Sequence, residues 1–379
     1  MRRTIALVPS LIVVAAASAL AQSVTLPPSG DNQKASVTQH IGLVKVTVDY
    51  SSPDVTGPGG EDRRGRIWGA LVPYGIHDLG FNGRRGPWRA GANENTVFAV
   101  SHPVQIEGKP LPAGRYGLHM LAGEHEWTVI FSRNSTSWGS FSYDESEDAL
   151  RVTVVPQKAP FREYLTYEFT ERKGDRATLA LAWEELRVPL TITVDDAAAL
   201  YVGNLRNELR GSAGFSWQNW VAAAQYCVQQ NRDLEEALAW AENAVALPFV
   251  GQANFTTLST KAQVLEKLGR GGEASAVMAK ALDLPGAEPV EIHMYGRRLL
   301  MEGRTKDALA VFERNQKRFG DAWPVHVGLA RGYSALGDYK TALKHAEIAV
   351  GQAPDPLNKK SLEEAIQKLR QGKDMNPGG

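Results

Sequence analysis

A repeat in the second half of the chain limits its fold more than any other feature. Alanine recurs as Ala237, Ala274, Ala308 and Ala342, at spacings of 37, 34 and 34 residues. Around each of these alanines the apolar residues follow a helical period. A period of about 34 residues predicts helix pairs, each of which cannot bury its apolar face alone. Neighbouring pairs must therefore stack, and the sequence predicts an all-α helical solenoid.

Four segments around these alanines carry a more specific resemblance. They resemble the second helices of tetratricopeptide (TPR) repeats, and their sequences are "LEEALAWAENAVAL", "GEASAVMAKALDLP", "TKDALAVFERNQKRFG" and "YKTALKHAEIAVGQAP". In three units a glycine lies five residues before the alanine, at Gly269, Gly303 and Gly337, whereas the first unit has Arg232 there. The resemblance implies four TPR-like repeats over residues 215–356, followed by a capping helix and flexible tail over 357–379.

The chain before Asp195 has a different period. From Ala35 onward, short runs alternate apolar and polar residues with a period of two, separated by Gly, Pro, Asn and Asp. This pattern is typical of strands, and many strands without helices between them indicate an all-β antiparallel sandwich or barrel. We predict this domain over 35–195 and a linker or helix over 196–214. The clear runs are Leu43–Tyr50, Thr96–Ser101, Arg115–Leu121, Glu126–Phe131, Leu150–Val155, Glu163–Phe169, Arg176–Trp183 and Val188–Val194. Gly123 marks a hairpin between two of them.

This β region also resembles a known family. Strings such as "VTVDYSSPDV", "WGALVPYG", "WRAGANENT", "IEGKPLPAGRYGLHML", "EWTVIFS" and "WGSFSYDESEDALRV" are similar, in this order, to the secreted bacterial domain of unknown function DUF2911. The resemblance implies no activity and no residue roles, because the family has none assigned. The chain departs from the pattern between Tyr74 and Trp88, where "GIHDLGFNGRRGP" is longer than expected.

The first 21 residues predict export. Arg2 and Arg3 precede an apolar run that ends in Ala19-Leu20-Ala21, as in a secretory signal peptide with a cleavage site before Gln22. We therefore expect a periplasmic or secreted bacterial protein with a flexible linker over 22–34. No comparable apolar run follows, so we expect no stable membrane insertion after cleavage.

Composition excludes several function classes. The 42 Lys and Arg residues balance the 42 Asp and Glu residues, so no global field favours a nucleic-acid partner. Cys227 is the single cysteine, which excludes an intramolecular disulfide framework and multi-cysteine metal sites. The histidines have no recognised metal-ligand spacing, and we predict no metal, no cofactor and no assigned catalytic residue.

Some residues of the β region are nevertheless candidates for chemistry. His119 with Glu94 would suit proton transfer or zinc binding, although His119 can equally be a structural histidine. Trp88, Arg89, Asn93 and Glu94 combine the groups that grip a polar ligand. Trp138, Tyr143 and Asp144 would add a stacking surface and acceptors. The structural alternative is that Arg89 pairs with Glu94 or Asp144 and that the tryptophans fill the core.

The TPR resemblance also implies a concave groove lined by the first helix of each repeat. Its predicted lining residues are Asn219, Tyr226, Gln263, Lys267, His293, Arg297 and Arg331. Because Lys267, Arg297 and Arg331 are cationic, an acidic protein segment or peptide is the expected partner. The alternative is that these are ordinary solvated helix residues.

Together these features favour an exported protein that binds protein partners through the groove without catalysis. The alternative is an enzyme or a binder of a small ligand, such as a sugar, peptide or metal, with its site on the β region. The sequence sets no oligomeric state.

Overall fold

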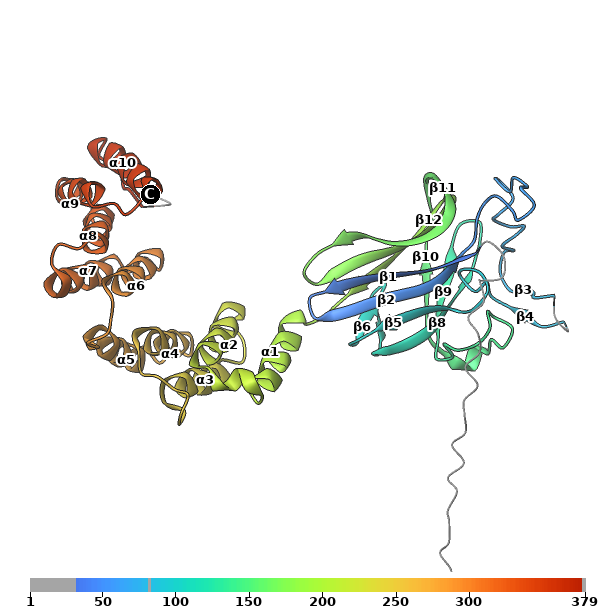
Figure 1. Ribbon diagram of the computed structural model, residues 1–379, viewed down its shortest axis with the longest axis horizontal. Helices are drawn as coiled ribbons and strands as arrows, with labels where there is room; N and C mark the ends of the chain where they lie inside the picture. Colours follow the sequence, from blue (N-terminus) through green and yellow to red (C-terminus); the bar gives the residue numbers. More distant parts are fainter. Residues whose placement is uncertain (1–31, 81–82, 377–379) are drawn as a thin grey trace, which may run out of the picture. The chain divides into compact units, whose positions relative to one another are not determined.

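The computed structural model describes residues 32–80 and 83–376, and the chain divides into two compact units at Ala197–Ala198. We call them the β domain and the helical domain (Figure 1). Their boundary lies close to Asp195, where the sequence period changes. The predicted signal peptide, residues 1–21, lies outside the described residues. Within the described part of the chain, no helix is both long and apolar enough to cross a bilayer.

The β domain contains two main antiparallel sheets and one short hairpin. The six-stranded sheet has the order β1 (Gln33–Ile41), β2 (Val44–Ser52), β5 (Thr96–Val100), β8 (Gly114–Leu121), β9 (Trp127–Ser132), β10 (Asp148–Val154). The four-stranded sheet has the order β11 (Gln157–Arg172), β12 (Arg176–Thr193), β6 (Val104–Ile106), β7 (Lys109–Leu111). The short strands β3 (His77–Asp78) and β4 (Arg85–Gly86) pair with each other. The hairpin predicted around Gly123 joins β8 to β9.

A cluster of four tryptophans joins the two sheets. Trp127 of β9 and Trp183 of β12 are each 1% exposed. Trp68 packs edge-on to both, with ring centroids 5.0 and 5.6 Å away, and Trp88 stacks on Trp183 at 6.4 Å. Edge-on and stacked contacts of this kind add to the burial of large apolar area. The predicted all-β antiparallel fold is therefore confirmed, with two separate sheets rather than one closed barrel.

Two predicted boundaries in the β domain need correction. Strand β1 begins at Gln33, inside the predicted linker 22–34. The runs Arg176–Trp183 and Val188–Val194 belong to one long strand, β12, instead of two. The polar residues between these runs are accommodated by an irregularity at Glu184, whose φ of 54° is unusual for a strand residue. Pairing with β11 therefore continues across the interruption.

The helical domain begins with α1 (Ala197–Glu208) and the short 3-10 helix η2 (Ser212–Phe215), within the predicted linker region. Four helix pairs follow: α2 (Trp217–Gln230) with α3 (Leu234–Ala246), α4 (Phe255–Lys267) with α5 (Gly271–Asp283), α6 (Pro289–Met301) with α7 (Thr305–Phe319), and α8 (Trp323–Ala335) with α9 (Tyr339–Gly351). The helix α10 (Pro356–Arg370) ends the series. In Figure 1 the first helices of the pairs lie along the inner side of a curved array. The predicted TPR-like solenoid is confirmed.

The repeated small residues act as predicted. Ala237, Ala274, Ala308 and Ala342 are at most 1% exposed, and all four belong to the hydrophobic clusters of the domain, where a larger side chain would have no room. The turns between paired helices need a left-handed residue, and Gly269, Gly303 and Gly337 supply it with φ of 75°, 75° and 82°. Asn231, with φ of 49°, supplies it in the first pair. Asparagine tolerates this conformation better than most residues, which explains how the first unit dispenses with glycine.

Candidate functional site

Trp88 is a core residue rather than a ligand contact. Its backbone N–H donates to Met120 O at 2.9 Å, and Met120 N–H donates back to Trp88 O at 2.8 Å. Its side chain is 8% exposed within the tryptophan cluster. The segment after Trp88 is therefore anchored to β8, and the structural alternative holds for this residue.

Arg89 has neither of the acidic partners that the structural alternative expected. Its Nη1 donates to Asn93 O at 2.8 Å, and its guanidinium lies 5.1 Å from the centre of the Phe141 ring. Among the described residues it forms no ion pair, and burial lowers its pKa. Glu94 and Asp144 are both engaged elsewhere, so Arg89 is held by a carbonyl and an aromatic face.

Glu94 faces the other side of this segment. Its carboxylate pairs with Lys34 Nζ at 3.0 Å and accepts a hydrogen bond from Ser51 Oγ at 3.1 Å. The hydrogen bond from Lys34 is the largest of the effects that lower the pKa of Glu94. Asn93 adopts a left-handed φ of 55°, which marks the turn between Arg89 and Glu94.

His119 is buried away from Glu94. Its side chain is 2% exposed, its Nδ1 shares a 2.8 Å hydrogen bond with Ser140 Oγ, and Tyr143 packs edge-on at 5.2 Å. Burial and then the charge of Arg89 lower its pKa to about 4, so the ring is neutral at neutral pH. The predicted acid–base or metal pair of His119 with Glu94 is therefore not assembled.

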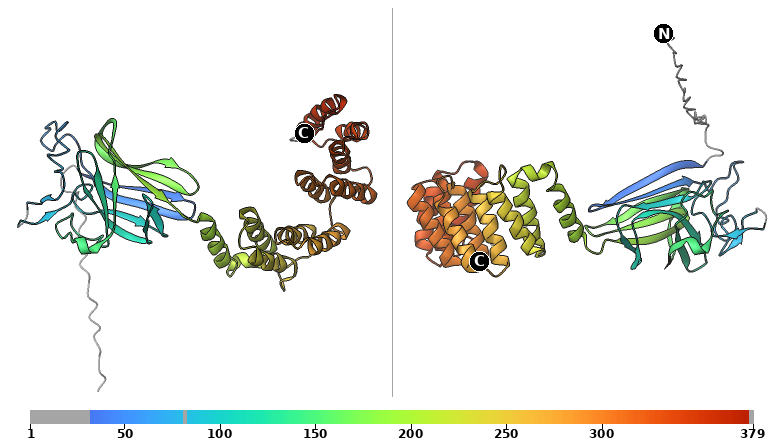
Figure 2. Two further views of the ribbon diagram at one scale, coloured as in Figure 1. Left: turned by 180° about the vertical axis from the view of Figure 1, so that it is seen from behind. Right: turned by 90° about the horizontal axis from the view of Figure 1, so that it is seen from below.

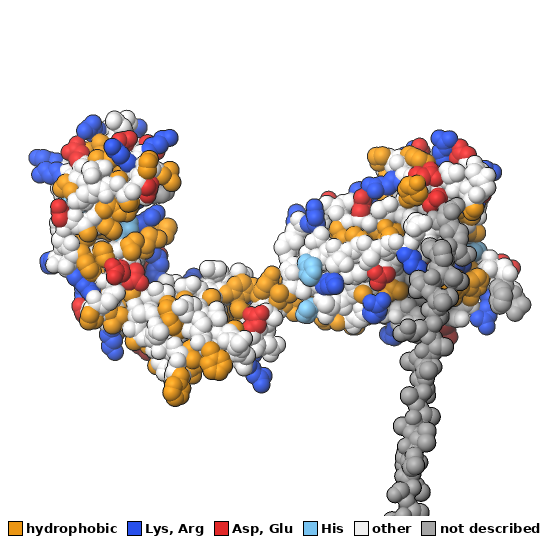
Figure 3. All heavy atoms as spheres, in the orientation of Figure 1, with side chains coloured by type: hydrophobic (Ala, Val, Ile, Leu, Met, Phe, Trp, Pro, Cys, Tyr) orange, Lys and Arg blue, Asp and Glu red, His pale blue; other side chains and the backbone are white. Residues whose placement is uncertain are grey.

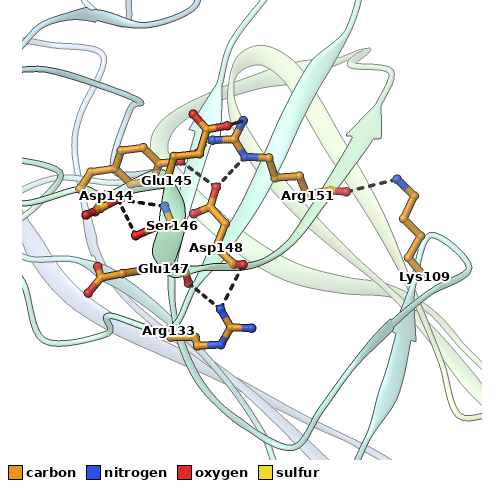
Figure 4. A network of polar contacts seen from close by, with 9 residues as sticks. Lys109, Arg133, Asp144, Glu145, Ser146, Glu147, Asp148 and Arg151 are labelled. Atoms are coloured by element: carbon orange, nitrogen blue, oxygen red, sulfur yellow. Dashed lines mark hydrogen bonds and ion pairs between the residues drawn. The ribbon is translucent and has the colours of Figure 1, made fainter.

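The other predicted ligand residues, Tyr143 and Asp144, belong to a network that holds the loop before β10 (Figure 4). Tyr143 donates its hydroxyl hydrogen to Asp148 Oδ2 at 2.8 Å, and Arg151 Nε donates to the same oxygen at 2.6 Å. Burial is the main cause that raises the pKa of Tyr143. Asp144 Oδ1 accepts from Ser146 N at 2.9 Å, which starts the 3-10 helix η1 (Glu145–Glu147). Both side chains are thus structural.

Trp138 is the last predicted ligand residue of the β domain. Trp138 is 59% exposed, so it alone of the predicted aromatic residues presents a surface for stacking. Across residues 32–80 and 83–376, no group of three or more His, Cys, Asp or Glu side chains is arranged to hold a metal ion.

In the helical domain, three predicted groove residues contact other residues of the domain. His293 is 5% exposed and lies 5.8 Å from the Phe312 ring, so it belongs to the core rather than the groove lining. Tyr226 packs on Tyr201 of α1 at 5.7 Å. Asn219 is exposed, but its Nδ2 donates to Ala213 O at 2.8 Å. The groove prediction therefore needs correction at His293, whereas Tyr226 is half-buried and Asn219 is exposed.

A cleft of about 280 Å³ lies between α4 and α6, and we call it the apolar cleft. These two helices make fewer contacts with each other than α2 makes with α4 or α6 makes with α8. Val290 is 49% exposed and Met294 53% exposed. The lining residues are Phe255, Thr256, Ser259, Gln263, Val290, Glu291, Met294, Tyr295 and Arg298. Of these, the sequence predicted only Gln263.

A second cleft of about 420 Å³ adjoins the apolar cleft and is lined largely by charged side chains; we call it the charged cleft. Lys267, a predicted groove residue, lines it together with Gln263. Glu266 sits between two arginines, 3.6 Å from Arg298 and 3.4 Å from Arg304. Lys267 has no ion pair in the described chain, so this cation is available to a ligand.

Arg297 and Arg331 influence each other electrostatically. Burial and then the charge of Arg297 lower the pKa of Arg331 to about 10. Arg297 has no carboxylate partner among the described residues, whereas Arg331 Nη1 donates to Asn376 Oδ1 at 3.3 Å. The two guanidiniums thus lie near each other, but the Arg331 guanidinium is already hydrogen-bonded to Asn376.

Comparison with known proteins bears on the β domain. Residues 32–192 match the model of the family described as "Protein of unknown function (DUF2911)". The β domain is a DUF2911 domain. The matched range ends one residue before β12 does, so the family similarity covers both main sheets.

No curated protein matches the chain. Among solved structures, one titled "MamA 41-end from Desulfovibrio magneticus RS-1" is 19% identical and covers 42% of this chain and 95% of its own. Its TM-score is 0.27.

Proposed function

We propose that this protein is exported to the bacterial cell envelope, where the inner side of its helical domain binds peptide segments of protein partners without catalysis. The apolar cleft carries this proposal. It places the exposed side chains of Val290 and Met294 beside the Gln263 amide and the Arg298 guanidinium. An apolar anchor flanked by a few polar groups is the usual chemistry of peptide recognition. Figure 3 shows hydrophobic side chains mixed with basic ones on the visible face of this domain.

The charges near the apolar cleft favour an acidic peptide. Lys267 lies in the adjoining charged cleft, and Arg297 lies on the same helix as Met294. Neither cation has a carboxylate partner in the part of the chain that the structure describes. A peptide with an apolar side chain between Val290 and Met294 and carboxylates on either side would satisfy both cations.

Peptides selected from a random display library against the parent chain should depend on Met294. Met294→Glu puts a carboxylate into the apolar cleft, so we expect at least tenfold weaker binding by fluorescence anisotropy. Met301→Glu is the matched control, because Met301 is on the same helix, 80% exposed and outside the cleft. Equal loss in both variants, or no loss in either, would contradict the proposal. Selected peptides rich in Lys and Arg would contradict the acidic partner.

Export gives a separate prediction. The signal segment predicts that the mature chain begins at Gln22. Intact-mass analysis of the periplasmic or secreted fraction should show the loss of residues 1–21. A cytoplasmic protein that retains Met1 would refute the envelope location.

A further inference from the structure

The chain after α10 folds back onto α8. Gly372 has a φ of 70° and turns the chain directly after the helix. The next residues, Lys373–Asn376, which we call the C-terminal segment, were predicted to be a flexible tail. Instead Met375 is only 6% exposed, in a core cluster with residues of α8, α9 and α10. Figures 1 and 2 show the described chain turning back after α10 toward the inner side of the curved array.

Ser334 and Arg331 of α8 each donate one hydrogen bond to this segment and accept one from it. Ser334 Oγ donates to Asp374 Oδ1 at 2.5 Å and accepts from Met375 N at 3.0 Å. Arg331 Nη1 donates to Asn376 Oδ1 at 3.3 Å, while Asn376 Nδ2 donates to Arg331 O at 3.1 Å. The contact therefore uses one acidic side chain, one backbone N–H and one side-chain amide of the bound segment.

Met375 supplies the apolar part of the contact. It packs in a pocket of small and aliphatic side chains that includes Ala330 of α8, Ala346 of α9 and Leu369 of α10. Methionine is unbranched and fills irregular apolar gaps well. An apolar anchor with polar groups on both sides is the arrangement proposed above for an external peptide.

The charges around the segment fit an acidic occupant. Arg297 and Arg331 place two cations in this region, and Asp374 is the carboxylate of the segment that acts on Arg331. Asp374 Oδ1 also accepts from Asn376 N at 3.1 Å and Asn376 Nδ2 at 2.9 Å, which fixes the turn of the segment. The C-terminal segment thus occupies the position that an acidic guest was expected to take.

We propose that the surface of α8 around Arg331 and Ser334 is a peptide-binding site, that the C-terminal segment fills it as an intramolecular ligand, and that an acidic partner peptide binds there only by displacing this segment. The binding of an acidic partner peptide rests on the proposed function of the helical domain. The intramolecular contact does not depend on that function. A tethered segment acts at an effective concentration in the millimolar range. Free peptide should therefore bind the intact chain far more weakly than a chain without the segment.

The test uses the segment itself as the probe. A chain that ends at Gly372 is mixed with a fluorescent peptide of residues 371–379, QGKDMNPGG, and binding is followed by anisotropy. We expect this chain to bind the peptide at least tenfold more tightly than the parent chain does. Peptides with Asp374→Asn or Met375→Ala should lose most of this affinity. The Lys373→Ala peptide should keep it, since the Lys373 side chain is exposed.

A folded shortened chain that does not bind the peptide would overturn the proposal, as would equal binding by the Met375→Ala peptide. Should the shortened chain fail to fold, trypsin cleavage after Lys373 in the full-length protein decides. Ser334→Ala removes two hydrogen bonds to the segment, so cleavage should be at least fivefold faster. Ser361→Ala on α10, an exposed position, is the control and should leave the rate unchanged. Equal rates in all three proteins would overturn the proposal. Neither test involves the apolar cleft, so failure here is distinct from failure of the Met294 test.

Discussion

Replacing Phe312 by alanine should lower the free energy of unfolding of the helical domain by about 3–5 kcal/mol. The Phe312 ring is fully buried and fills space that three glycines leave open. A Cβ atom built on Gly296, Gly328 or Gly332 would lie 2.2, 2.5 or 2.9 Å from the ring. Loss of the ring leaves a cavity that rigid helix backbones on two sides cannot close. Chemical denaturation followed by the helical circular dichroism signal measures the change.

The glycines provide the control for this packing. Gly296→Ala should destabilise the domain by about 1–3 kcal/mol through overpacking, although the same change in an open helix normally stabilises by up to about 1 kcal/mol. Gly203→Ala in α1 is the matched case, because nothing lies within 4 Å of its added Cβ. In the Phe312→Ala background the penalty at Gly296 should disappear. A stabilising Gly296→Ala in the parent would show that this packing is wrong.

The sequence could predict the repeats because their determinants are local and periodic. Each of the four alanines is buried, and a left-handed residue lies in the turn five or six residues before it. Both features recur at nearly regular spacing, with intervals of 37, 34 and 34 residues between the alanines. The β domain was predictable for a similar reason, since alternation along a strand reports its buried face. The long strand β12 was missed because charged residues from Glu184 to Arg187 interrupt that alternation, at the point where the pairing with β11 is irregular.

The candidate sites were less predictable because they depend on partners far apart in sequence. Glu94, in the loop before β5, is paired with Lys34 of β1, and His119 is covered by a loop that brings Ser140 to its ring. Neither contact leaves a spacing signal. The apolar cleft was missed for another reason: Val290 and Met294 look like core residues in the sequence. Only the sparse contact between α4 and α6 shows that they face an opening.

The error at His293 has a physical cause that the sequence could not show. Its repeat position belongs to the predicted groove, but the neighbouring Gly328 of α8 has no side chain to hold the helices apart. The ring therefore sinks between α6, α7 and α8 and contacts Phe312. Its Nδ1 is buried without a hydrogen-bond partner.

The helical domain should lose stability as the pH falls below about 6.5. Burial, followed by the charges of Arg331 and Arg297, lowers the pKa of His293 to about 3 in the folded chain. Between pH 6.5 and pH 3, His293 is protonated in the unfolded chain, where its pKa is about 6.5, but not in the folded chain. The free energy of unfolding therefore keeps its full value above pH 6.5 and declines toward pH 3. The loss from this one residue is on the order of 4 kcal/mol. His293→Gln cannot titrate in this range, so the free energy of unfolding from urea denaturation at pH 7 and pH 4.5 should differ less in the variant than in the parent. Equal pH dependence in the two proteins would show that His293 is protonated in the folded domain and is not enclosed as described.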